Sequence, residues 1–301
     1  MQELLIHKYY PKTLDDFVER DIPTLIKEFI KINTIKLLFI SKQSNGKTAF
    51  INAIIRDYYG KITGDVLIIN NIKEYGISYF KNEVIQFCRS PSFTNKKKMI
   101  VLDDFDCLND NNQHIFKNII ETYDINYILS CSSPQKILES IQSMLYVIEI
   151  KKMTPQKISV IYDEIKLNER LVIDEETKNY IIHFLSIKQM INNMEKYKLL
   201  NVPITIDVAK ELSSTIHPQI FQQYVDELDN KNLNGCIKIF YDLYDEGYSV
   251  MDILYNFYEY TKNLNLDYSQ HICKYIVAFH NIHEDVIELA LFTNSIFKNI
   301  L

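Results

Sequence analysis

The residues best suited to chemistry lie in one short stretch near the start of the chain. Gly46-Lys47-Thr48 follows the apolar run Leu37–Ile40 and opens a longer amphipathic stretch. Between a buried strand and a helix, such a loop turns backbone N–H groups and a helix N-terminus toward a polyphosphate. Lys47 can then reach the β- and γ-phosphates of ATP, and the Thr48 hydroxyl can bind Mg²⁺. The sequence therefore predicts a nucleotide-binding loop made of Ser41, Lys42, Gln43, Ser44, Asn45, Gly46, Lys47 and Thr48.

One position departs from the usual phosphate-loop pattern, which has glycine where Ser41 stands. An ordinary strand, turn and helix with a surface lysine would share the Gly-Lys-Thr triplet. The chain contains only six glycines, however, and one of them falls at this junction between strand and helix. That placement favours the phosphate loop over the ordinary turn.

An acidic motif follows a second apolar run. Met99–Leu102 is apolar throughout and leads directly into Asp103-Asp104. A carboxylate at the end of a strand beside a phosphate loop holds Mg²⁺, and we expect Asp103 to do so. We expect Asp104 to be the catalytic carboxylate that orients the attacking water. A strand ending in an acidic turn is common by itself, but the two motifs in this order favour a nucleotide site.

Two polar residues further along could also contact phosphate. Ser132 follows the apolar run Asn126–Cys131, and Lys188 begins a helical stretch in the middle of the chain. Each residue taken alone is more often a solvated polar side chain. Beside a phosphate loop, both become candidates for the γ-phosphate region.

Apolar runs alternate with amphipathic stretches through the first half of the chain. Short runs that are apolar at nearly every position are typical of strands covered on both faces. Their alternation with helices predicts βαβ units and a parallel sheet. The expected strands are Lys36–Ile40, Asp65–Asn70, Met99–Asp103, Asn126–Cys131 and Leu145–Ile150, and the expected helices are Lys47–Tyr58, Ile77–Cys88, Asn112–Tyr123 and Pro134–Gln142.

The pattern becomes entirely helical after Ile150. Thr154-Pro155 is a typical helix start, because threonine caps a helix and proline fits its first turn. Val202-Pro203 interrupts the helical periodicity a second time. We therefore predict three domains, at residues 1–152, 153–203 and 204–301.

The composition is that of a folded protein. The chain has 33 basic and 39 acidic residues, a net charge of −6, and 47% hydrophobic residues. This balance argues against a strongly basic, freestanding nucleic-acid binder but does not exclude DNA contact by a local basic face. Lys96-Lys97-Lys98 suggests a solvated loop, with contact to a phosphate backbone as the alternative. The five cysteines form no CxxC pair, which argues against a disulfide framework or a zinc site.

We expect a soluble intracellular protein that makes no contact with a membrane. No apolar run approaches the roughly 20 residues of a membrane-spanning helix. The opening residues alternate apolar with charged side chains and lack the apolar centre of a signal peptide. Nucleus, cytoplasm and viral factory are not distinguished by these features.

Taken in order, these motifs resemble the small subunits of clamp loaders of the replication factor C type, which are AAA+ ATPases. The opening His7–Phe17 is similar to the family's KYRPKTLDD start, which lies against adenine, and Tyr10 replaces its arginine. The resemblance makes Tyr9 a nucleotide contact. It also places Ser132 at the sensor 1 asparagine and Lys188 at the sensor 2 arginine.

The resemblance implies an α/β fold: a AAA+ P-loop parallel-sheet domain, a small helical lid domain and an all-α C-terminal collar. It implies a small subunit of a hetero-oligomeric clamp loader that binds other clamp-loader subunits. Such a complex uses ATP and Mg²⁺ to open a ring-shaped sliding clamp and load it onto primer–template DNA. Lys117 matches a family arginine that follows the DNA backbone, and Lys81 is a weaker DNA-binding candidate.

Two departures from the family weaken the expectation of ATP hydrolysis. Asp104 is one methylene shorter than the usual glutamate. Met144 stands where the segment similar to Lys136–Ser143 normally continues into an arginine that enters the neighbouring ATP site. An ATPase-type subunit and a mainly structural, hydrolysis-deficient subunit therefore both stay open. Another AAA+ replication-initiation ATPase would explain the sheet but not the opening motif.

Overall fold

The computed structural model describes residues 3–42, 44–60, 64–70, 77–200, 202–212, 216–263, 268–279 and 285–300. Gln43 of the expected loop lies outside these residues. The chain divides into two compact units, Met1–Ile206 and Asp207–Leu301. The border expected near residue 152 lies inside the first unit, so the division into three domains stays a proposal.

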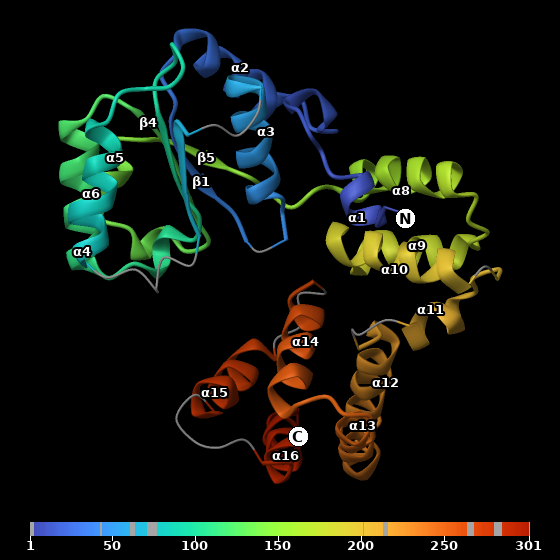
Figure 1. Ribbon diagram of the computed structural model, residues 1–301. Coiled ribbons are helices and arrows are strands. Elements are labelled where there is room, and N and C mark those ends of the chain that lie inside the picture. Colours follow the sequence, from blue (N-terminus) through green and yellow to red (C-terminus); the bar gives the residue numbers. More distant parts are fainter. Residues whose placement is uncertain are drawn as a thin grey trace. The chain divides into compact units, whose positions relative to one another are not determined.

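The first unit contains a parallel sheet of five strands in the order β2-β3-β4-β1-β5 (Figure 1). In the centre of the sheet, Leu38 of β1 pairs with Leu129 of β4. The α/β class predicted from the sequence is therefore confirmed, and each expected strand is present with its ends shifted by at most one residue. The strands are β1 Lys36–Ile40, β2 Val66–Ile69, β3 Met99–Leu102, β4 Asn126–Cys131 and β5 Tyr146–Glu149.

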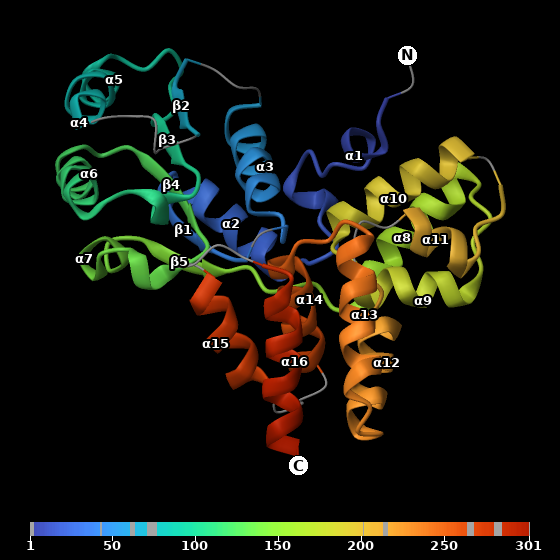
Figure 2. The ribbon, with the colours of Figure 1, turned by 90° about the horizontal axis from the view of Figure 1, so that it is seen from below.

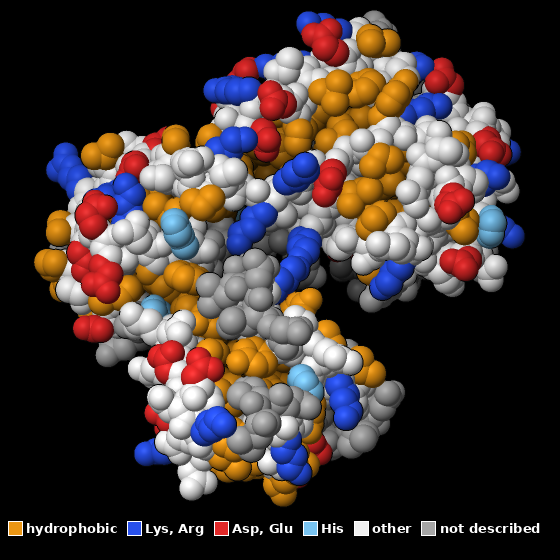
Figure 3. Space-filling view, turned by 180° about the vertical axis from the view of Figure 1, so that it is seen from behind, with side chains coloured by type: hydrophobic (Ala, Val, Ile, Leu, Met, Phe, Trp, Pro, Cys, Tyr) orange, Lys and Arg blue, Asp and Glu red, His pale blue; other side chains and the backbone are white. Residues whose placement is uncertain are grey.

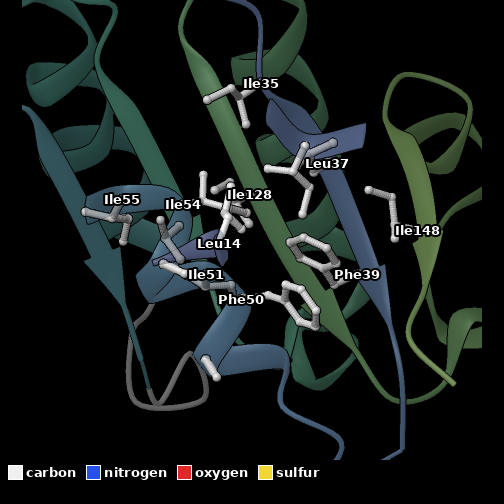
Figure 4. Packing of buried hydrophobic residues seen from close by; sticks show 14 of the residues in the cluster. Leu14, Ile35, Leu37, Phe39, Phe50, Ile51, Ile54, Ile55, Ile128 and Ile148 are labelled. Atoms are coloured by element: carbon white, nitrogen blue, oxygen red, sulfur yellow. The ribbon is translucent and has the colours of Figure 1, made fainter. Parts of the chain in front are cut away.

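Helices cover both faces of the sheet (Figure 2). On one face, α3 carries Phe50, whose ring lies 6.2 Å from that of Phe39 of β1 (Figure 4). The Phe50 ring also stacks on Phe17 at a centroid distance of 3.9 Å. On the other face, Phe116 packs between Phe105 and Tyr127. The helices are α2 Asp21–Ile32 and α3 Lys47–Tyr59 on the first face, and α4 Ile77–Tyr79, α5 Ile85–Arg89, α6 Asp110–Thr122 and α7 Glu139–Gln142 on the second.

Two local expectations were wrong, and one helix was missed. Residues 134–142 do not form one helix: a 3₁₀ turn at Pro134–Lys136 is separated from α7 by extended backbone. The Gln142 amide holds this break by donating to the carbonyl oxygens of Pro134 and Ile137. Strand β5 is an edge strand with exposed Tyr146 and Val147, so it is not covered on both faces. Helix α2 was not expected at all.

The lysine cluster is a surface loop at Lys96 and Lys97, as expected, but Lys98 is part of the core. Lys98 is buried, and its ammonium donates to the Phe87 carbonyl at 2.6 Å and to both oxygens of Ser90. Lys96 donates to the Tyr58 carbonyl. Lys97 pairs with Asp124 at 2.7 Å. Burial removes Lys98 from any contact with a phosphate backbone, whereas this alternative stays a prediction for Lys96 and Lys97.

Three helices complete the first unit: α8 Pro155–Glu169, α9 Glu175–Phe184 and α10 Ile187–Leu200. Thr154 takes the expected N-cap position of α8, and Pro155 lies in the first turn, but the threonine side chain makes no capping hydrogen bond. The short helix α1 Leu5–Lys8 packs against α10.

The second unit is entirely helical in the residues that the structure describes. Its core is aromatic: Tyr224 stacks on Phe240 at 4.0 Å, Phe257 lies edge-on to both rings, and the Tyr224 hydroxyl bonds Thr293 at 3.1 Å. No helix among the described residues of either unit is long and apolar enough to cross a membrane. The helices are α11 Ile206–Leu212, α12 Pro218–Asp229, α13 Leu233–Asp245, α14 Val250–Asn263, α15 Ser269–Phe279 and α16 Ile287–Ile300.

The buried carboxylate of Asp65 holds the loop that precedes β3. It accepts hydrogen bonds from the Phe93 amide at 2.7 Å, from both the amide and the hydroxyl of Thr94 at 2.7 Å, and from the Ser92 hydroxyl at 3.1 Å. Burial raises the pKa of this carboxyl group, but the hydrogen bonds outweigh burial and leave the pKa below its ordinary value.

We expect Asp65→Asn to lower the free energy of unfolding of the first unit by about 1–3 kcal/mol at pH 7, because buried donors lose an acceptor. The Asp65 contribution is complete above the ordinary carboxyl pKa, near pH 4, and is lost as the pH falls through the lowered pKa. Urea unfolding at pH 7 and pH 3 measures both effects, with exposed Asp15→Asn as the control. An equal loss at the two pH values would contradict this account of Asp65.

Candidate nucleotide-binding site

The phosphate loop follows β1 and leads into α3. Gly46 precedes the first residue of α3 and has φ +90°, a left-handed conformation that favours glycine. Ser44 also has positive φ, at 64°. Ser41 is buried, its φ is not positive, and its amide donates to the Cys131 carbonyl at 3.1 Å. The backbone therefore needs glycine at position 46 and accepts serine at position 41.

Lys47 is the buried cation of this loop, with only 8% of its surface exposed. Its ammonium donates to the Ser41 carbonyl at 2.9 Å and to the Ser132 hydroxyl at 2.7 Å, and it lies 3.8 Å from the Asp104 carboxylate. Burial of an ammonium group is tolerated only when such partners replace water. The structure therefore brings together four of the expected site residues, because Ser41, Ser132 and Asp104 all lie against the Lys47 ammonium group.

Thr48, in the first turn of α3, lies beside Asp103, which directly follows β3. The Thr48 hydroxyl donates to the Asp103 carboxylate at 3.1 Å, and the Ser130 hydroxyl donates to the second Asp103 oxygen. The Ser130 hydroxyl oxygen also accepts a hydrogen bond from the Asp104 amide at 3.1 Å. A hydroxyl and a carboxylate are the hard oxygen ligands that Mg²⁺ prefers, and phosphate oxygens and water usually supply its other ligands. The pair therefore fits a magnesium ion that arrives with a nucleotide.

Asp104 and Asp106 shape the loop that follows β3. Asp104 has φ 53°, a left-handed conformation in which Asp is more often found than Glu, and its side chain is exposed. The Asp106 carboxylate accepts hydrogen bonds from the backbone amides of Ser132 at 3.2 Å and Ser133 at 2.9 Å. These bonds fix the residues after β4. The roles of Ser130 and Asp106 were not expected from the sequence. The available signals were that Asp106 follows the acidic motif closely and that Ser130 is a polar residue in the apolar run before Ser132.

The other expected site residues are not brought to the loop. The Tyr9 hydroxyl donates to Glu169 of α8 at 2.8 Å. Lys188 is exposed near the start of α10, and no hydrogen bond or ion pair to the loop is found for it within the described residues. Lys117 of α6 pairs with Glu121 at 3.6 Å, and Lys81 is exposed. Lys42 is exposed within the loop itself.

Glu169 is a nearly buried carboxylate that holds several donors. Lys198 of α10 lies 2.8 Å from one of its oxygens, and Lys8 and Tyr9 donate to the other. The hydrogen bonds from Lys198, Lys8 and Tyr9 outweigh burial and lower the pKa of Glu169 to about 2. Burial and the Glu169 charge raise the pKa of the Tyr9 hydroxyl. Glu169 is therefore ionised near neutral pH.

The strand order, the phosphate loop and the acidic motif define a P-loop protein of the AAA+ class. AMPPCP-bound DnaA from Aquifex aeolicus has a similar structure, with a TM-score of 0.62 and 16% identity over 96% of this chain and 98% of that chain. The Thermotoga maritima RuvB Holliday junction branch migration motor has a TM-score of 0.53 and 12% identity, covering 72% of this chain and 79% of that one. At these identities the likeness describes the fold alone.

Sequence comparisons point to one group within this class. Residues 216–290 match the replication factor C C-terminal domain. The replication factor C small subunit of Methanocella arvoryzae is 27% identical over 274 residues, covering 88% of this chain and 85% of the relative. That of Methanococcus maripaludis strain C7 is 25% identical over 275 residues, covering 88% and 87%. The expected resemblance is confirmed, and the low identity makes this chain a divergent relative of the replication factor C small subunits.

Removal of the Lys47 ammonium should weaken nucleotide binding. We expect Lys47→Ala to raise the Kd for Mg-ATP at least tenfold, or about 1.4 kcal/mol, because the loop then lacks its buried cation. Titration with a fluorescent ATP analogue measures this change, and Lys42→Ala in the same loop is the matched control. Equal affinity of the wild type and Lys47→Ala would show that phosphate does not bind here.

Proposed function

We propose that this chain is a small subunit of a clamp-loader complex, which uses ATP binding to open a sliding clamp and load it onto primer–template DNA. One observation carries the proposal: a nucleotide-type loop and a replication factor C C-terminal domain occur in the same chain. The likeness to DnaA favours the AAA+ fold equally for an initiator ATPase. The C-terminal domain match and the opening motif favour the clamp loader.

ATP would bind at the carboxyl edge of the sheet. Lys47 would exchange its contact with Asp104 for the β- and γ-phosphates, while Ser132 stays within reach of the same ammonium. Thr48 and Asp103 would hold Mg²⁺, which neutralises phosphate charge when bound. Lys188 and Tyr9 would reach the nucleotide only if helices α8–α10, the proposed lid helices, approach the loop. Asp104 remains the candidate for orienting water.

Other subunits would bind through the second unit. Its described surface exposes large apolar side chains, which favour association when they gather in an interface. The exposed residues are Tyr244, Tyr255, Val277, Ile287 and Leu291. This surface makes the all-helical unit the proposed collar of a hetero-oligomer.

DNA contact would be local and weak for one subunit. The face shown in Figure 3 carries both acidic and basic side chains, with hydrophobic side chains between them. Lys117 and Lys81 are the proposed contacts with the DNA backbone, but Glu121 already neutralises part of the Lys117 charge. Contact of this kind reads no bases and weakens with salt.

Truncation tests the assembly role directly. A chain that ends at Ile206 keeps the complete first unit, so it should retain Mg-ATP affinity within about twofold while losing co-purification with replication factor C partners. Co-expression followed by affinity purification measures assembly, and nucleotide titration of the same preparation confirms folding. Assembly of the truncated chain at wild-type yield would exclude the second unit as the collar.

A mainly structural, hydrolysis-deficient subunit is the second candidate, and two observations favour it. Asp104 has a left-handed backbone and lies beside Lys47. Met144 packs partly buried against one core of the sheet and carries no charge for a neighbouring ATP site. An arginine in this role typically raises the rate by about 10³–10⁵.

We expect the isolated chain to hydrolyse ATP more slowly than about 1 per second, a common enzyme rate. Asp104→Glu should stay slow, because glutamate disfavours the left-handed backbone at this position and no arginine comes from an identical neighbour. Single-turnover phosphate release measures the rate, with Lys47→Ala as the blank. A rate above 1 per second for the wild type would rule out the hydrolysis-deficient subunit.

A further inference from the structure

The N-terminal segment contacts the lid helices at its start. Leu5 is buried, and its amide donates to the carboxylate of Glu195 on α10. Lys8 and Tyr9 both donate to Glu169 of α8, at 2.7 and 2.8 Å. Two carboxylates of the lid helices therefore hold the first residues of the described chain.

A few residues further along, the same segment contacts the helix that follows the phosphate loop. The Tyr10 hydroxyl accepts a hydrogen bond from the Asn52 amide at 2.9 Å, and the Leu14 amide donates to Asp57 at 3.0 Å. Phe17 stacks on Phe50. Asn52, Asp57 and Phe50 all belong to α3, whose first residues are Lys47 and Thr48.

The adjacent residues Tyr9 and Tyr10 thus point to different partners. Tyr9 is bonded to the lid helices and Tyr10 to the phosphate-loop helix. Glu169 is only 5% exposed at its side chain, and its second oxygen is held by Lys198 of α10 at 2.8 Å. Charge-assisted hydrogen bonds of this kind are the strong ones.

We propose that residues 5–17, the N-terminal strap, tie helices α8 and α10 to α3 without any nucleotide, with Glu169 as the positioning residue on the lid. Lys188 lies on α10, so the strap would set how far this lysine is from the phosphate loop. A lid already held in place loses less conformational freedom when a ligand binds. The effect on nucleotide affinity rests on the proposed function, whereas the tie itself does not.

Hydrogen–deuterium exchange of the nucleotide-free full chain tests the tie. In the wild type, amides of residues 5–9 should be protected. Glu169→Gln, and Lys8→Met combined with Tyr9→Phe, should speed their exchange at least about tenfold, because charged hydrogen bonds are lost. Lys198→Met, which keeps both strap contacts, should change it less than about threefold. Peptides of β1 and β4 should exchange unchanged in all variants, which reports that the sheet stays folded.

Lys8→Arg with Tyr9 intact should keep wild-type protection, since arginine keeps the charge and the donors. The proposal is overturned if the strap amides exchange equally fast in the wild type and in Glu169→Gln without nucleotide. It is also overturned if Lys198→Met releases the strap as fully as the double variant does.

A second measurement separates the strap from the nucleotide site. The double variant should weaken Mg-ATP affinity about three- to tenfold, while Lys47→Ala removes phosphate binding and leaves the strap protected. If the wild type binds no nucleotide, the proposed function fails but the exchange result still decides the tie. If nucleotide binds and the double variant has wild-type affinity, the strap does not position the site.

Discussion

The buried ammonium group of Lys47 is the interaction on which the site depends. A lysine with 8% exposure needs partners that replace water, and it finds them on residues of the segments that directly follow β1, β3 and β4. These segments are neighbours because parallel strands end at one edge of the sheet. The strand order therefore determines which residues surround the Lys47 ammonium group.

A charge at this position also explains the polar contacts around it. Among the described residues, Ser130 and Asp106 make no hydrogen bond or ion pair with Lys47, yet they fix Asp103, Asp104 and the residues after β4 through hydrogen bonds. Gly46 gives the loop its left-handed turn. An anionic phosphate can enter such a site by replacing a carboxylate contact, since the backbone is already shaped.

Much of the first unit could be predicted from the sequence, because its strands are short, apolar and separated by helical stretches. The loop at Ser41–Thr48 and the acidic motif were identified for the same reason: each follows a buried strand. What the sequence could not reveal depends on contacts between distant residues. Lys98 can be buried because its ammonium group donates to the carbonyls of Phe87 and Ser90. Glu169 connects the N-terminal strap to α10 through its ion pairs with Lys8 and Lys198. The edge position of β5 follows from sheet order, which local periodicity does not encode.

The most direct test is clamp loading by a reconstituted complex. A labelled ring-shaped clamp, primed circular DNA and the partner subunits are mixed with or without this chain, and the clamp retained on DNA is measured after gel filtration. We expect the clamp to be retained on DNA only when both this chain and ATP are present. Equal retention when this chain is left out, or when ATP is omitted, would contradict the conclusion that this chain is a working subunit of a clamp loader.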